Sequence, residues 1–332
     1  MSAEGGREIR EGTIEPEPTW KSQPEWLFWL EYLKTVDPRQ NQAPSIQSFR
    51  HLPQAVKFSD ENRVRVWYER FSAKRQAQRE KRERGEMSEE ALAARELDMS
   101  LGPTGHLLEG ILVDLIEERQ MFGDAVVLRA SRFDDLFNGV DAVLEWACDA
   151  QYGVFPRLAV DFSVSNSSNG TGGKKAKRGE AMYVKYLRSH FERGGGRARE
   201  LSLDVPGVVI RVPRDAFKAA ARAAMERGEK ADSHDLAVPE LRRMIVEQTS
   251  VQMSKRAVDL FIYLRGLAPH HPPMDAAFQK LLAGEPIDTI VPALLQIQPR
   301  DINMMTKNQA ETSYIVDFLA VWKSVKNAAQ HV

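Results

Sequence analysis

The sequence predicts an α+β protein in which a mixed core carries helical additions at both ends. Two observations support this class. Apolar residues recur at helical spacing before residue 122 and again after residue 214. Between these segments, four short runs are rich in valine and leucine and are separated by turn residues, as is typical of strands. The predicted element order of the core is helix, strand, strand, strand, helix, strand.

The N-terminal part of the chain predicts a leader followed by helices. Residues 1–20 are rich in glycine, proline and glutamate, a composition typical of a disordered leader. Residues 21–103 predict a helical N-terminal region, in which a long polar helix runs from about Glu61 to Arg84. Between Lys57 and Arg84, ten Lys/Arg stand against five Asp/Glu. Such an excess is typical of a solvated helix surface or, as the alternative, of a phosphate-binding surface.

Residues 104–213 predict the mixed core. A strongly periodic helix is expected over Thr104–Phe122, and a second helix over Arg178–Arg193, where three glycines follow. Four strands are expected because valine and leucine dominate the remaining apolar runs and Asn138-Gly139 is a typical turn. The predicted strands are Ala125–Ala130, Val140–Trp146, Arg157–Val164 and Val208–Val212.

Residues 214–332 predict a helical C-terminal region. Asp215 can cap an alanine-rich helix that ends near Arg227. A longer helix is expected over Pro239–Leu267, where following prolines end it, and a last helix over Asn308–Gln330. We expect the helical ends to bind substrate, to form a homodimer or to recruit a partner protein.

Composition restricts the class of protein. The chain has 332 residues, with 46 Lys+Arg against 47 Asp+Glu and a net charge of -1, which excludes a globally basic nucleic-acid coat. No apolar run reaches the roughly 18 residues of a membrane span, and the N-terminus lacks an apolar signal core. The single cysteine, Cys148, can form neither an internal disulfide nor a zinc site by itself. We therefore expect a cytoplasmic protein without a membrane partner.

Two carboxylates interrupt the predicted strands. Asp141 lies in the second strand and Asp161 in the third, where a carboxylate is unfavourable unless it is paired, hydrogen-bonded or bound to a metal. If these strands pair antiparallel, the two side chains face each other with Cβ atoms about 5 Å apart. A divalent cation relieves the repulsion, and oxygen ligands suit Mg²⁺ or Mn²⁺. The alternative for Asp141 is a turn-end aspartate that bonds local backbone.

The element order and the two acids resemble the PD-(D/E)xK nuclease superfamily. The residues that carry the resemblance are the segment SRFDDLFNGVD, which ends at Asp141, and the segment LAVDFS, which contains Asp161 and Ser163. The resemblance covers roughly residues 104–213 and implies a restriction-endonuclease-like core. The first motif acid of the superfamily falls on Asp141 and the second on Asp161. Ser163 stands where the family places its lysine.

The resemblance also implies the remaining site residues. Some members carry the lysine on the helix that follows, which makes it Lys185 in this chain, with Lys177 as the alternative. A glutamate that members carry on the first core helix falls on Glu109, with Glu117 and Glu118 as alternatives.

The activity implied by the resemblance is hydrolysis of phosphodiester bonds with Mg²⁺ or Mn²⁺. In that mechanism Asp141, Asp161 and Glu109 hold the metal, which lowers the pKa of a bound water, and Lys185 orients the water or offsets the charge on the phosphate. The expected substrate is nucleic acid, DNA rather than RNA. Residues expected to bind it form a basic cluster beside a Ser/Asn/Gly loop: Lys174, Lys175, Lys177 and Arg178.

Two other readings remain open from the sequence. Ser163 in place of the motif lysine favours a catalytically inactive adaptor or structural protein that keeps a nuclease-like core. An RNase H-like nuclease also uses acids on strands, but that fold opens with a strand, whereas a helix precedes the strands here.

Overall fold

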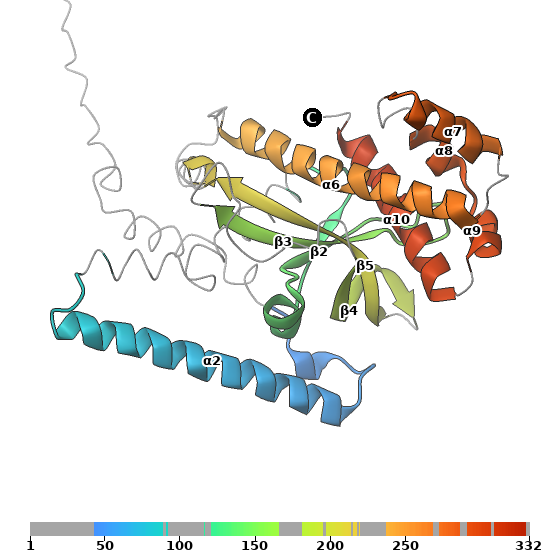
Figure 1. Cartoon of the computed structure of the whole chain (residues 1–332). Helices are drawn as coiled ribbons and strands as arrows, with labels where there is room; N and C mark the ends of the chain where they lie inside the picture. The colour runs from blue at the N-terminus through green and yellow to red at the C-terminus, as the bar shows by residue number, and fades with distance from the viewer. Residues whose placement is uncertain are drawn as a thin grey trace, which may run out of the picture.

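A computed structural model describes most of the chain. The sheet lies at the centre, and several helices cover one of its faces (Figure 1). A long helix near the N-terminus, blue to cyan in the figure, lies outside the sheet and extends away from it. The described residues are 43–88, 91, 116, 121–165, 181–194, 197–213, 215–217, 219, 237–267, 272–285, 291–306 and 309–329.

The central element is a five-stranded mixed sheet in the order β1-β2-β3-β5-β4. Strands β1, β2 and β3 form an antiparallel meander, β5 lies parallel to β3, and β4 pairs with β5 as an antiparallel hairpin. The protein is therefore a mixed α+β protein, as the sequence predicts. The strands are β1 Val126–Arg129, β2 Ala142–Glu145, β3 Arg157–Ser165, β4 Ala181–Gly194 and β5 Arg197–Pro213.

All four predicted strands are confirmed. The first three predicted runs correspond to β1, β2 and β3, and the fourth, Val208–Val212, lies inside β5. Strand β5 is longer than predicted because it has two partners in succession. Its first part, up to Pro206, pairs with β4, and its second part, from Gly207, pairs with β3.

The predicted helix over Arg178–Arg193 is wrong, because residues 181–194 form strand β4. Three apolar residues of this strand, Met182, Val184 and Leu187, are buried in a core cluster. Tyr183 and Arg188 are exposed. The pairing with β5 shifts register between Val184 and Leu187. This shift interrupts the period of two that identifies a strand, so the run also fits a helical period. Two strands, not a helix and a strand, therefore follow β3 among the described residues.

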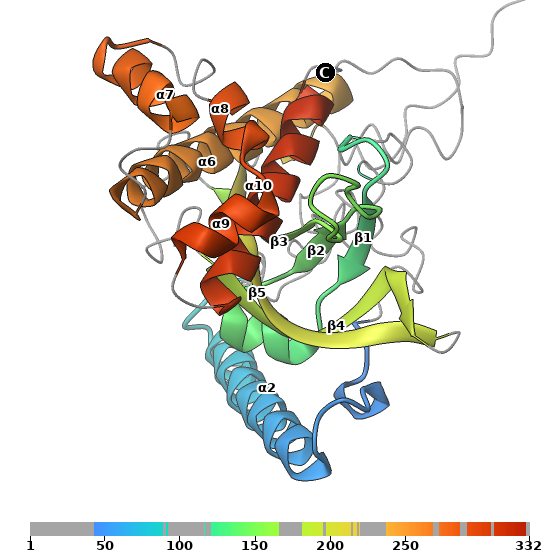
Figure 2. The same ribbon diagram turned by 90° about the vertical axis from the view of Figure 1, so that its right-hand side faces the viewer.

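Helices cover one face of the sheet (Figure 2). The main core lies between this face and the helices, and it includes Ile210 and Val212 of the sheet with Phe261 and Trp322 of the helices. The predicted helices Pro239–Leu267 and Asn308–Gln330 correspond to α6 and α10. The helices of this layer are α6 Ala237–Leu267, α7 Pro272–Leu282, α8 Val291–Gln296, α9 Pro299–Met305 and α10 Gln309–Ala329.

Helix α6 protects the edge that β5 leaves open after β4 ends. The side chain of Gln252 accepts from the amide of Val209 at 3.0 Å and donates to its carbonyl at 2.7 Å. One turn earlier, Gln248 makes the same two bonds with Arg211, at 2.9 and 2.8 Å. Two glutamines therefore replace a missing strand and satisfy backbone groups that would otherwise be open to another chain.

The sheet curls so that β4 crosses over β2 on the face opposite the helices. Glu145 of β2 accepts hydrogen bonds from the amides of His190 and Phe191 in β4, at 2.6 and 3.3 Å. The curl encloses a second, smaller core that contains Val143 and Ala159 of the meander. Residues of the meander thus alternate between the helix-covered face and this enclosed face.

The N-terminal part of the described chain holds a 3-10 turn, η2 (Ile46–Ser48), and the long helix α2 (Gln54–Glu83). The predicted helix from Glu61 to Arg84 is confirmed and begins two turns earlier. It ends at Glu83, and two residues later Gly85 has a φ of 72°, in the left-handed region that favours glycine. A third small core, which includes Phe49, Phe133 and Tyr186, joins this region to β4 and to a π-helix, η3 (Asp134–Asn138).

Some predicted elements lie mostly outside the described residues. These are the leader, most of the Thr104–Phe122 helix and most of the helix that begins at Asp215. Of the first helix, Ile116 is described as helical and buried. Among the described helices, none combines the length and the apolar composition needed to cross a membrane.

Candidate functional site

The two predicted acids lie next to each other, Asp141 just before β2 begins and Asp161 at the middle of β3. The last printed pair of the antiparallel ladder is Ala142 with Val160, so Asp141 precedes the one and Asp161 follows the other. The amide of Asp141 donates to the carbonyl of Val160 at 2.9 Å. The carboxylate of Asp141 accepts from the amide of Phe162 at 2.6 Å. Asp141 therefore contacts the residues on both sides of Asp161.

Both aspartates belong to the face of the meander that is opposite the helices. Asp161 alternates with Val160, which lies in the main core, and shares its face with Ala159 of the second core. Asp141 stands opposite Ala130 of β1, whose amide donates to its carbonyl at 3.2 Å, and Ala130 also belongs to the second core. Each aspartate is half-buried. The pair is thus accessible at the rim of the enclosed face.

The hydrogen bond from Phe162 gives Asp141 a local role as well. At this end of the ladder the Asp141 carboxylate takes the place of a carbonyl and satisfies a backbone amide of β3. The alternative left open by the sequence was a turn-end aspartate that bonds local backbone, whereas this bond joins Asp141 to the neighbouring strand β3. One carboxylate oxygen holds the amide, and a carboxylate has further lone pairs that can serve a cation.

Strand β5 adds a basic residue to the same face. Ser163, which stands in the family's lysine position, pairs in parallel register with Arg211 of β5. The preceding pair on this face is Asp161 with Val209, and Val209 belongs to the second core. Neighbouring strands lie about 5 Å apart, so the Arg211 side chain is within reach of the acids. Sequence reasoning missed Arg211 because the parallel register of β3 and β5 depends on the whole sheet.

Lys185, the predicted catalytic lysine, lies on strand β4. Its Nζ is 2.5 Å from Oδ2 of Asp60 in α2, and Oη of Tyr186 donates to the same oxygen at 2.7 Å. The ammonium group also lies 4.9 Å from the ring centre of Phe133. These contacts join α2 to β4 and give Lys185 a structural role.

Several predicted site residues lie outside the described part of the chain. They are Glu109, Glu117 and Glu118 of the first core helix and the basic residues Lys174, Lys175, Lys177 and Arg178. Among the described residues, no group of three or more His, Cys, Asp or Glu is arranged to hold a metal ion. The described part of the site therefore consists of two carboxylates and Arg211.

A buried carboxylate fixes the turn that leads into Asp141. Asp134 of η3 accepts hydrogen bonds from the amides of Lys185 and Tyr186 in β4, at 2.8 and 3.0 Å. Its carboxylate also accepts from Ser131 at 2.8 Å and from Asn138 at 2.7 Å. Burial raises the pKa of Asp134, against the opposite effect of these four donors. The network positions η3, and with it the start of β2, against β4.

A second buried network ties β2, β3 and β4 together on the enclosed side. Glu145 is fully buried. Its carboxylate accepts hydrogen bonds from Nε of Arg157 at 2.8 Å and from Oγ of Ser189 at 2.6 Å. Arg157 also reaches Glu192 at 2.9 Å. Nearby, burial raises the pKa of Asp317 in α10 to about 6, while Arg157 lowers it and Glu192 raises it.

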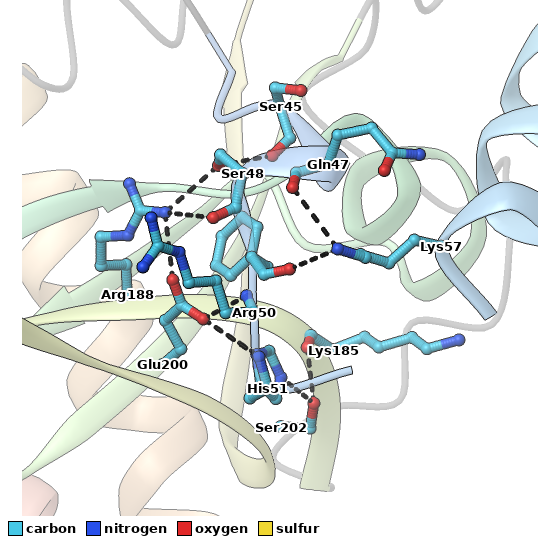
Figure 3. A network of polar contacts seen from close by, with 11 residues as sticks. Ser45, Gln47, Ser48, Arg50, His51, Lys57, Lys185, Arg188, Glu200 and Ser202 are labelled. Atoms are coloured by element: carbon cyan, nitrogen blue, oxygen red, sulfur yellow. Dashed lines mark hydrogen bonds and ion pairs between the residues drawn. The ribbon is translucent and has the colours of Figure 1, made fainter. Parts of the chain in front are cut away.

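The chain before α2 docks on the β4–β5 hairpin through a third polar network (Figure 3). Glu200 of β5 accepts from the amides of Arg50 and His51 and forms an ion pair with Arg188 at 3.3 Å. Burial alone would raise the pKa of Glu200, but these hydrogen bonds outweigh it and hold the pKa below its usual value. His51 also bonds Ser202 at 2.8 Å. Because every group here has a protein partner, the network fixes the N-terminal segment in place.

Comparison with known proteins adds no further assignment. No protein-family model, no curated protein and no solved structure matches this chain.

Proposed function

We propose that the protein is a divalent-metal-dependent nuclease whose metal carboxylates are Asp141 and Asp161. The observation that carries this proposal is the pair itself, with the Asp141 backbone and carboxylate bonded on both sides of Asp161. The two half-buried carboxylates lie on one face and carry four oxygens, of which the amide of Phe162 uses one. Such a set of oxygens supports the proposal because divalent cations bind carboxylate oxygens.

The donor chemistry fits Mg²⁺ or Mn²⁺. Magnesium is held in proteins by one or two carboxylates, and substrate phosphates and water complete its shell. Two aspartates on neighbouring strands meet this requirement, and Glu109 is the third ligand that we propose from the core helix. When bound, such an ion lowers the pKa of a water molecule and stabilises charge on a phosphate.

The chain's own residues would then have distinct roles. Asp141 and Asp161 bind the ion and fix its position, because Asp141 is itself held by the amide of Phe162. Arg211, beside Ser163 in the parallel register, offsets negative charge on the phosphodiester. The proposal also includes that β1, β2, β3 and β5 form a restriction-endonuclease-like core. Lys185 stabilises the structure through Asp60 and is not assigned to the reaction.

The test is cleavage of labelled single- and double-stranded DNA and RNA in Mg²⁺, in Mn²⁺ and in EDTA. We expect metal-dependent cleavage, with DNA as the preferred substrate, that falls by at least about 100-fold in Asp161→Asn. Asp204→Asn, an exposed aspartate on β5, is the matched control and should retain full activity. Unchanged cleavage in folded Asp141→Asn and Asp161→Asn variants would exclude the catalytic role of the pair.

One observation favours a second candidate, a catalytically inactive adaptor with a nuclease-like core. The motif position holds Ser163, and the lysine on β4 is bound to Asp60. Absence of cleavage by the wild-type chain in every metal, together with no binding of Mn²⁺ in calorimetry, would support this candidate.

A further inference from the structure

Helix α2 carries a line of basic side chains that leads away from the candidate site. Arg63, Arg70, Lys74 and Lys81 follow one another at intervals of seven, four and seven residues. At 3.6 residues per turn, these positions lie within about 40° of one another around the helix axis. We call Arg70, Lys74 and Lys81 the basic stripe, and the side chains of all three are exposed.

The line of basic side chains begins where α2 packs against η3, because Arg63 contacts two aromatic rings there. The guanidinium of Arg63 lies 4.3 Å from the ring centre of Phe137 and 5.0 Å from that of Phe133. Helix η3 ends three residues before Asp141 in the chain. The ion pair between Asp60 and Lys185 fixes the same part of α2 to β4. The direction of the helix is therefore fixed by its contacts with η3 and β4.

Beyond this anchor, α2 extends away from the sheet and from the C-terminal helices (Figure 1). From Arg63 to Lys81 the line spans about 27 Å, at a rise of 1.5 Å per residue. This length equals the axial rise of about eight base pairs of duplex DNA. The segment Arg70–Arg84 holds seven Lys/Arg against Glu80 and Glu83, in a chain whose net charge is -1. An excess of positive charge is thus concentrated in the C-terminal half of α2.

Local stabilisation of the helix accounts for only part of this charge. Lys81 and Arg82 lie in the last turn, where cations interact favourably with the helix dipole. Arg70 and Lys74 lie two or more turns before the end, where this effect has decayed. Together with Arg63, they form a line of positive charge that is complementary to a partner with regularly spaced negative charges.

We propose that α2 is a nucleic-acid-binding arm whose basic stripe holds the sugar-phosphate backbone of duplex DNA. This inference rests on the proposed function, because it names the substrate-binding surface that leads to Asp141 and Asp161. Phosphates along a duplex present the repeated negative charge that a straight, exposed basic line complements. The duplex runs along α2 from Lys81 toward Arg63, which contacts η3, and η3 leads in the chain to Asp141.

The experiment measures binding of the full chain to a fluorescent 30-base-pair DNA duplex by anisotropy, in EDTA so that no cleavage occurs. The arm variant is Arg70→Gln, Lys74→Gln and Lys81→Gln in one chain. The matched control removes three exposed charges from α6 and α7, at Arg243, Lys255 and Lys280. Far-UV circular dichroism checks that α2 stays helical in both variants.

We expect the arm variant to lose affinity and salt dependence together. Three lost phosphate contacts lower the slope of log K against log salt by about 2.7, which corresponds to a loss of up to about 500-fold at 0.1 M salt. The control should stay within about two-fold of the wild type. An arm variant with wild-type affinity, or an equal loss in the control, would overturn the proposal. Binding to phosphatidylserine vesicles with none to DNA would overturn it in favour of a membrane surface.

The outcome is separable from that of the nuclease proposal. Asp204→Asn leaves both the stripe and the two acids intact and should bind DNA as tightly as the wild type in EDTA. If the wild-type chain binds DNA through the stripe but cleaves nothing in any metal, the arm stands and the nuclease proposal fails. If the wild-type chain cleaves nucleic acid and the arm variant binds DNA with wild-type affinity, the nuclease proposal stands and the arm proposal fails.

Discussion

Removal of the ion pair between Asp60 and Lys185 should weaken the attachment of α2 to the sheet. The two side chains are largely buried, with 5% of Asp60 and 18% of Lys185 exposed, and their charged atoms are 2.5 Å apart. The hydroxyl of Tyr186 donates to the same carboxylate oxygen at 2.7 Å. The changes are Asp60→Ala, Lys185→Met and the double variant. Met keeps the aliphatic stem that packs near Phe133.

The expected magnitudes follow from the burial of the pair. Asp60→Ala leaves a partly buried ammonium group and the Tyr186 hydroxyl without their acceptor, which costs about 3–5 kcal/mol of unfolding free energy. Lys185→Met leaves the carboxylate with Tyr186 alone and costs about 3 kcal/mol. The double variant leaves no uncompensated charge. Its destabilisation should be smaller than the sum of the two by about 2 kcal/mol.

Urea unfolding of the four chains of this cycle, followed by tryptophan fluorescence, provides the measurement. The control cycle uses Arg65 and Glu69, an ion pair at 2.8 Å on the same helix with 65% and 58% of the side chains exposed, whose coupling should be below about 0.5 kcal/mol. Additive effects of Asp60→Ala and Lys185→Met would refute the reasoning. Loss of cleavage in a folded Lys185→Met variant, with cleavage intact in Asp60→Ala, would instead restore Lys185 to the reaction.

Two further predictions concern the other buried carboxylates. Asp134→Ala leaves the amides of Lys185 and Tyr186 without an acceptor and should destabilise the protein by about 3 kcal/mol in urea unfolding, whereas a change below about 0.5 kcal/mol, as expected for Asp204→Ala, would contradict the structural role of Asp134. Because burial raises the pKa of Asp317 to about 6 from 3.8, the folded chain binds the proton more tightly, so the ionised side chain lowers stability as the pH rises through this window. Asp317→Asn should therefore raise the unfolding free energy by at most about 3 kcal/mol above pH 6, with no gain below about pH 4, and an equal gain at pH 4 and pH 8 would contradict the assignment.

The strands of the meander were predictable because their signals are local. Valine and leucine are enriched in β1, β2 and β3, whereas the Asn-Gly dipeptide that predicted a turn lies at the end of the π-helix η3, where Gly139 is the left-handed cap with a φ of 68°. Helices α6 and α10 were predictable from their apolar periodicity. Strand β4 was not, since its pairing with β5 and the shift after Val184 create a pattern that a helix also satisfies. The pairing with β5 makes this segment a strand. Although β5 is close in sequence, the periodicity of β4 alone does not indicate this pairing.

The candidate site shows the same division. The acids Asp141 and Asp161 were identifiable because each interrupts an apolar strand, and the antiparallel pairing of β2 with β3 makes them neighbours. The roles of Lys185 and Arg211 were not identifiable. Lys185 lies on a strand that was expected to be a helix, and its partner Asp60 is 125 residues away. Arg211 joins the site only through the parallel register of β5 on β3.

The sequence by itself determined the mixed α+β class, the meander, the long helices and the position of two acids in neighbouring strands. These features depend on residue preferences and periodicities that act over a few positions. Only the tertiary structure decided that β4 is a strand, that the sheet curls, that Lys185 anchors α2, and that Arg211 lies on the same face of the sheet as the acids. Each of these depends on hydrogen bonds and charge pairs between distant segments, whose free energy exists only after the chain has folded.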